Sequence, residues 1–313
     1  MEKWSECFQN PEYLAKTRMA SLRPEMAGLF AKWLGLKPGL RILDVGCGSG
    51  ELTRYLKKAS DGLLLTGLDS DESFIAYAKE ADDGGITYIC ADALNMPFES
   101  GSFDLVVSHT FLTAVPEFDK AIKEMRRVCV PDGMIASFTP INIFQVTYDE
   151  GFYPESLTWK KEYDELNRKK QAMYDALTPI GDYAGGIAPM KIPRAFSLSG
   201  MEKVSVHPYG RFFSLSDASM SDEEKRRYID LDFISEDKRL DAVYKLPEAW
   251  ELMTEDEVKR LKSLMKVRRE YLLDNLKENE IWELEANGNL LVTGKRGAYL
   301  DETIKEAAWW KAI

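Results

Sequence analysis

A short apolar run that ends at an acid and a glycine-rich turn constrains the fold of this chain more than any other stretch. The run is Arg41-Ile42-Leu43-Asp44-Val45, and the turn is Gly46-Cys47-Gly48-Ser49-Gly50. Glycines let the backbone turn sharply and approach a ligand where a Cβ would clash. Residues 51–58 carry leucines four positions apart, as on one helix face. The stretch therefore predicts a strand, a glycine loop, and a helix whose N-terminus offers unpaired N–H groups.

Three later apolar runs continue this pattern. Residues 63–68 lead to Asp69, residues 86–91 lead to Asp92, and residues 105–108 lead to His109. An acid about 20 residues beyond a glycine loop can accept both ribose hydroxyls of a nucleoside, in NAD-binding folds as elsewhere. The alternative role for Asp69 is a helix N-cap, which Ser70 or Asp71 would fill equally well. The acids therefore indicate a nucleoside ligand at the carboxyl ends of parallel strands.

The acid-x-Gly-x-Gly-x-Gly order, together with Asp69, Asp92 and the strand ending at His109, resembles class I S-adenosylmethionine (SAM) methyltransferases of the type 11 group. The resemblance covers roughly residues 38–140 and the last strands loosely. It implies a Rossmann-like α/β fold, a seven-stranded sheet with helices on both faces, SAM as cofactor and S-adenosylhomocysteine as product. The residues expected to bind SAM are Asp44, Gly46, Cys47, Gly48, Gly50, Asp69, Ser70, Phe74, Ala91, Asp92, Ala93 and Ser108.

The family resemblance also indicates which residues are candidates for catalysis and for further contacts with SAM. His109 is the candidate catalytic base, since its strand ends above the methyl group in this architecture, and the alternative is a packing or hydrogen-bonding residue of the pocket wall. Leading helices in this family often fold over the SAM pocket, so Tyr13, Arg18 and Arg23 are candidates to reach the ligand, against plain surface or packing roles.

The domain organisation expected from these patterns is a single methyltransferase domain over residues 1–313. Residues 1–38 form an N-terminal helical cap and residues 39–140 the SAM-binding core. Helical insertions after the fifth and sixth strands, at 141–200 and 214–279, form a lid, against the alternative of structural decoration. Residues 201–213 and 280–299 are the terminal strands.

Local signals predict the details of the later elements. Residues 130–133 (Val-Pro-Asp-Gly) predict a turn, and Asn287-Gly288 predicts a hairpin between two strands. Pro208 places its strand near a sheet edge. Ser221 with Glu224 and Thr254 with Glu257 fit capping boxes. A short helix is expected from Leu300 to Ile313.

Composition argues against several classes of function. The net charge of −11 opposes a nucleic-acid surface, and no run reaches the ~18 uncharged apolar residues of a membrane span. The four cysteines lack metal-ligand spacing, so we expect no metal site, reduced buried thiols and a cytoplasmic protein.

The predicted function is transfer of a methyl group from SAM to a small-molecule acceptor. The alternatives are a methyltransferase acting on protein or RNA, which would need an open face, and a non-catalytic SAM-binding or NAD-type module. The sequence does not determine the acceptor or the oligomeric state.

Overall fold

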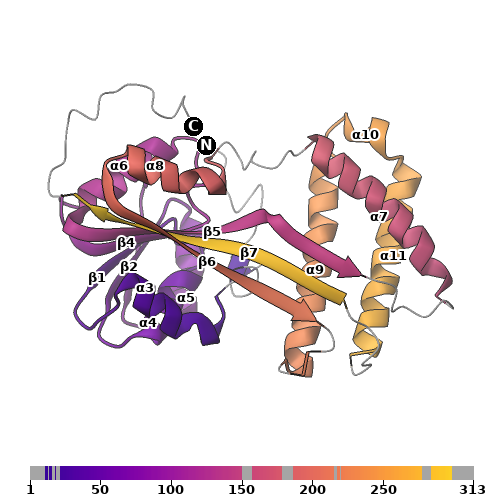
Figure 1. The fold of residues 1–313 in the computed structure, drawn as a ribbon, viewed down its shortest axis with the longest axis horizontal. Helices are drawn as coiled ribbons and strands as arrows, with labels where there is room; N and C mark the ends of the chain where they lie inside the picture. The colour runs from indigo at the N-terminus through magenta and orange to yellow at the C-terminus, as the bar shows by residue number, and fades with distance from the viewer. Residues whose placement is uncertain are drawn as a thin grey trace. The chain divides into compact units, whose positions relative to one another are not determined.

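The structure is a computed structural model, and it describes residues 11, 12, 14, 15, 18, 22–149, 157–177, 186–214, 217, 218, 220–276 and 283–297 (Figure 1). The chain divides into two compact units. Unit 1 comprises Met1–Ile141, Tyr183–Tyr209 and Gly288–Ile313, and unit 2 comprises Asn142–Asp182 and Gly210–Asn287. Cys7, Tyr13 and the helix expected at 300–313 lie outside the described residues.

The elements alternate between strand and helix in the first half of the chain. The strands are β1 (Arg41–Val45), β2 (Leu64–Asp69), β3 (Ile86–Cys90), β4 (Phe103–His109), β5 (Cys129–Asp149), β6 (Met201–Ser214) and β7 (Glu283–Arg296). The helices are α3 (Ala27–Leu34), α4 (Glu51–Ala59), α5 (Glu72–Ala81), α6 (Phe118–Val128), α7 (Thr158–Leu177), α8 (Ile192–Leu198), α9 (Asp222–Val243), α10 (Ala249–Leu252) and α11 (Glu255–Asp274), with 3-10 turns at Pro24–Met26 and Pro189–Lys191.

The predicted seven-stranded sheet is confirmed, with the strand order β3-β2-β1-β4-β5-β7-β6. Strands β1 to β5 pair in parallel, so Val45 lies beside Leu68 on one side and Ser108 on the other. The order reverses between β1 and β4, and the crevice at such a switch point is where open α/β sheets bind ligands. Strand β6, which carries Pro208, lies at the edge as predicted.

Helices cover both faces of the sheet in unit 1, because neighbouring residues of each strand point to opposite sides. Ile42 belongs to the apolar cluster that includes Phe30 of α3 and Leu56 of α4. Leu43 belongs to the cluster that includes Met125 of α6 and Phe196 of α8. Both strand residues are fully buried, as expected for strands covered on two sides.

Unit 2 has an apolar core of its own. Helices α7, α9, α10 and α11 pack together around Met173, Leu240 and Leu261, none of which is exposed. Both predicted capping boxes are present, at Ser221–Glu224 and Thr254–Glu257, and they begin α9 and α11. Helical segments therefore follow β5 and β6, as the sequence predicts.

Two local predictions are wrong. Residues 130–133 lie within β5, where they bulge from the ladder: Phe103 pairs with Cys129 and Leu105 with Met134, and Asp132 takes a φ of 60°. Asn287-Gly288 lies inside the continuous strand β7 instead of a hairpin. This strand has β5 on one side and β6 on the other, and ladder partners on both sides outcompete a local turn.

Candidate functional site

The glycine loop after β1 has the backbone that its sequence predicts. Gly46, Gly48 and Gly50 all have positive φ, at 67°, 53° and 84°. A Cβ on Gly46 would lie 2.4 Å from Phe111, and one on Gly48 would lie 2.7 Å from Leu14. Side chains at these positions would be strained by the backbone and crowded by their neighbours. The loop is therefore a cradle that requires glycine.

Asp69 holds this loop in place. Its Oδ2 accepts the Gly48 N–H at 2.8 Å, and its Oδ1 accepts the Asp71 N–H at 2.9 Å. Burial raises the pKa of Asp69, while these backbone donors act in the opposite direction. The N-cap role is taken by Asp71, which accepts the Ser73 N–H at 3.0 Å. Asp69 is thus a carboxylate at the carboxyl edge of β2 with a structural role in the loop.

Asp44 is a buried acid, and one of its carboxylate oxygens has no hydrogen-bond partner among the described residues. Its side chain is 1% exposed, and Oδ2 accepts the Thr53 hydroxyl at 2.7 Å. Oδ1 is buried and has no hydrogen-bond partner among the described residues. Burial raises the pKa of Asp44 to about 7, against the Thr53 hydrogen bond and with smaller effects from Asp69 and Glu51. A buried unpaired acceptor is costly, so this oxygen suits a cationic ligand group.

The end of β4 places polar side chains beside β1. His109 is 8% exposed, and its ring meets Phe138 edge-on at 6.1 Å between centroids. Burial, and then the charge of Arg18, holds the pKa of His109 well below its ordinary value, so the imidazole is neutral at pH 7. Thr110 follows with a φ of 60°, a left-handed conformation that is strained for a β-branched residue.

The N-terminal segment covers the glycine loop. Leu14 and Ala15 are buried, and the side chain of Leu14 lies over Gly48. Arg18, one helical turn further, interacts electrostatically with Glu51 and with His109. Arg23 pairs with Glu25 instead. Of the two predicted candidates in this segment that the structure describes, Arg18 is the one that lies near the loop.

The remaining predicted residues follow the same strand ends. Asp92 and Ser70 are exposed, whereas Ala93, Phe74 and Ser108 are buried. The Asp92 carboxylate accepts the Leu94 N–H at 2.8 Å. Strand β3 pairs with β2 through Cys90 and Asp69, which places Asp92 two residues beyond the edge that carries Asp69.

The thiols are only partly as predicted. Cys47 and Cys129 are buried, and burial raises the pKa of both. Cys90 is exposed, so the prediction of buried thiols is wrong for this residue, because it ends an outer strand of the sheet. Within the described ranges, no helix is long and apolar enough to span a membrane, and no group of three or more metal-ligating side chains occurs.

Sequence reasoning missed three residues of this site. Thr53 donates to Asp44 across nine positions, and Phe111 covers Gly46 across a loop of the sheet. Thr110 has a backbone conformation that its residue type disfavours. A threonine in the first turn of a helix after an acid-tipped strand is the one signal that points to such a contact in advance.

Comparisons with known proteins agree with this geometry. Residues 43–137 match the model of a methyltransferase domain. The demethylmenaquinone methyltransferase of Staphylococcus aureus strain MRSA252 is 40% identical over 108 residues, which is 33% of this chain and 44% of the relative. The homologue from strain JH9 is 38% identical over 107 residues, with the same coverage of 33% and 44%. The chain thus spans less than half the length of these curated relatives.

A solved structure shows the same fold. It is described as a putative methyltransferase from an antibiotic biosynthesis pathway of Anabaena variabilis ATCC 29413. The similarity has a TM-score of 0.51 at 16% identity and covers 85% of this chain and 96% of the other. Residues 43–137 are therefore similar to a methyltransferase domain, and the strand order and the glycine loop agree with that similarity.

Proposed function

We propose that the protein transfers a methyl group from SAM to a small-molecule acceptor. The observation that carries this proposal is the unpartnered Oδ1 of Asp44, buried beside a glycine cradle at the switch point of the sheet. The amino-acid end of SAM carries an ammonium group, which is the kind of donor that such an oxygen lacks. The residues present therefore fit this cofactor.

Each strand end has a proposed task toward SAM. Asp44 and the loop Gly46–Gly50 take the amino-acid end, and Asp69 accepts the ribose hydroxyls with the lone pairs not used by Gly48 and Asp71. Asp92 and the backbone beside it take the adenine. Arg18 has the charge to meet the carboxylate of the amino-acid end.

SAM supplies the electrophilic methyl group when bound, so the chain mainly has to align the acceptor and exclude water. His109 is buried and neutral, and its lowered pKa makes it a weak base. We therefore assign His109 the role of accepting a hydrogen bond from the substrate, which orients that molecule for methyl transfer. Such a site suits an acceptor that gives up its proton readily.

A small acceptor is supported by the relatives. Two curated relatives are named demethylmenaquinone methyltransferases, after an acceptor that is neither a protein nor a nucleic acid. The net charge of −11 disfavours RNA. The role of the helical insertions as a lid stays a prediction, which hydrogen exchange in the presence of SAM and acceptor would test.

The function is tested with SAM labelled in its methyl group. The purified chain is incubated with reduced demethylmenaquinone, and in parallel with total RNA and with a protein extract. The proposal predicts that the label appears in the organic phase of the incubation with reduced demethylmenaquinone, or of a parallel incubation with related phenols. Label in protein or RNA alone would contradict the small-molecule acceptor while leaving the transferase assignment intact.

A further inference from the structure

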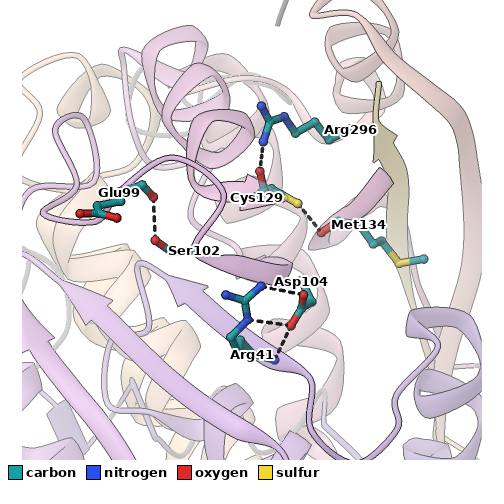
Figure 2. Close-up of polar contacts among 7 residues, drawn as sticks. All are labelled: Arg41, Glu99, Ser102, Asp104, Cys129, Met134 and Arg296. Atoms are coloured by element: carbon teal, nitrogen blue, oxygen red, sulfur yellow. Dashed lines mark hydrogen bonds and ion pairs between the residues drawn. The ribbon is translucent and has the colours of Figure 1, made fainter. Parts of the chain in front are cut away.

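Two arginines are buried near each other at the amino ends of the parallel strands, whereas the glycine loop lies at the carboxyl ends. Arg126 lies in the last turn of α6, and Arg296 is the last residue of β7. They are 5% and 6% exposed. Figure 2 shows the guanidinium of Arg296 donating to the carbonyl of Cys129, the residue that follows α6. The charge of Arg296 acts on Arg126, so the two side chains lie near each other at the carboxyl end of this helix.

Neither arginine has a carboxylate partner in the described part of the chain. The Nε atoms of both are buried and make no hydrogen bond to any described residue. Arg41, drawn in the same figure, differs: its Nε and Nη2 donate to the two oxygens of Asp104 at 3.0 and 2.9 Å. Arg127, next to Arg126, likewise pairs with Glu124 at 2.7 Å. Arg41 and Arg127 show that other arginines in this region do have carboxylate partners.

The charges nearby do not compensate for the pair. Burial, and then the charge of Arg296, lowers the pKa of Arg126, so the two guanidinium groups repel each other. The carboxyl end of α6 carries about half a negative charge, which offsets about a quarter of two positive charges. Lys295 adds a further positive charge where it donates to the Asp132 carbonyl at 3.2 Å. A Cβ added at Gly297 would lie 2.9 Å from the Glu202 carboxylate, and no ion pair joins Glu202 to Arg296 among the described residues.

We propose that Arg126 and Arg296 form a binding site for one small inorganic anion of the halide class. Two buried like charges are tolerated when an opposite charge lies between them. Both residues are more than nine-tenths buried, and a chloride ion loses its hydration at lower cost than a dianion such as phosphate. It is independent of SAM, because all of its groups lie at the amino ends of the parallel strands.

The test uses Arg126→Met, which keeps the buried stem but removes the charge. Thermal unfolding of the full chain is followed in sodium chloride and in sodium gluconate at equal ionic strength. Chloride should raise the unfolding temperature of the wild type by roughly 2–4 °C over gluconate. The variant should not respond to chloride, and in gluconate it should be more stable than the wild type, because one of the repelling charges is gone.

The control is Arg41→Met, which breaks a satisfied pair and should lower the unfolding temperature equally in both salts. Arg296→Met should lose the chloride response too, although it also removes a hydrogen bond to Cys129. In a bromide-soaked crystal, anomalous scattering should place one ion between the two guanidinium groups. An equal chloride response in wild type and Arg126→Met, or stabilisation by phosphate alone through these arginines, would overturn the proposal.

Discussion

The two ends of the parallel strands in unit 1 bury charges of opposite sign. At the carboxyl ends, Asp44 is 1% exposed and keeps one oxygen without a partner among the described residues. At the amino ends, Arg126 and Arg296 are 5% and 6% exposed, and their Nε atoms are unpaired within the same residues. Most buried polar groups in proteins are satisfied, so unpaired ones point to a ligand of the opposite charge. The comparison indicates a cationic ligand group at one edge and an anion at the other.

The largest expected effect comes from Gly48→Val, which removes the cradle at the carboxyl edge. A branched side chain at a φ of 53° is strained, and its Cβ would press on Leu14. We expect the protein to fold and its SAM affinity to fall roughly 100-fold or more, as measured by calorimetry. Gly28→Val is the matched control, because nothing lies within 4 Å of a Cβ at that position. Retained affinity in a folded Gly48→Val protein would show that the loop does not hold the ligand.

Asp69→Ala should have the next largest effect. It removes the carboxylate that holds Gly48 and that we assign to the ribose, at a cost of about 1.5–3 kcal/mol in SAM binding. Asp71→Ala, two residues away, removes an N-cap instead and should cost about 1 kcal/mol of stability with little change in SAM affinity. Equal SAM affinities in Asp69→Ala and the wild type would remove Asp69 from the site.

The pH dependence of SAM binding sharpens the assignment of Asp44. Its pKa is about 7 in the free protein, whereas an ammonium partner requires the ionised form. SAM affinity should therefore fall as the pH drops below 7, by at most about tenfold per pH unit. Stability without SAM should move the other way. The folded-state pKa lies above the unfolded value, so this group favours folding most below about pH 4, and that contribution is lost as the pH rises through 7.

Asp44→Asn is the control for this titration. The amide cannot ionise, so its SAM affinity should be lower than that of the wild type and flat between pH 5 and pH 7. Calorimetry in two buffers of different ionisation enthalpy should also detect a proton released when the wild type binds SAM near pH 6. If SAM binding by the wild type does not depend on pH, Asp44 does not bind the ammonium group.

His109→Asn should have the smallest effect on turnover. A positioning role predicts a loss of less than roughly tenfold, mostly in the KM for the acceptor, whereas a general base would cost about 100-fold or more in kcat. The variant should also lose the part of the pH dependence of folding stability that comes from His109. The pKa of His109 is lowered in the folded state, so folding stability should decrease as the pH falls below about 6.5. A 100-fold loss in kcat at unchanged SAM affinity would restore the catalytic base.

Much of this molecule is predictable from its sequence, because local signals and tertiary structure agree. The apolar runs that end at Asp44, Asp69 and His109 form strands at the predicted places, and the capping boxes at Ser221 and Thr254 begin helices. In each case the local preference and the burial of an apolar face favour the same structure.

The failures occur where long-range pairing decides. Asn287-Gly288 favours a turn on its own, but β5 and β6 offer hydrogen-bond partners on both sides of it. The orphan oxygen of Asp44 and the facing charges of Arg126 and Arg296 depend on which side chains fail to meet. No local pattern encodes the absence of a contact between distant residues.

Calorimetric titration of the purified chain with SAM, S-adenosylhomocysteine and NAD tests the central claim most directly. The loop geometry, the orphan oxygen of Asp44 and the acid at Asp69 predict that SAM and S-adenosylhomocysteine bind and that NAD produces no detectable heat. The Asp69→Ala protein serves as the matched sample and should bind SAM more weakly. Tight NAD binding, or no SAM binding by the folded wild type, would contradict the assignment of this chain as a SAM-dependent enzyme.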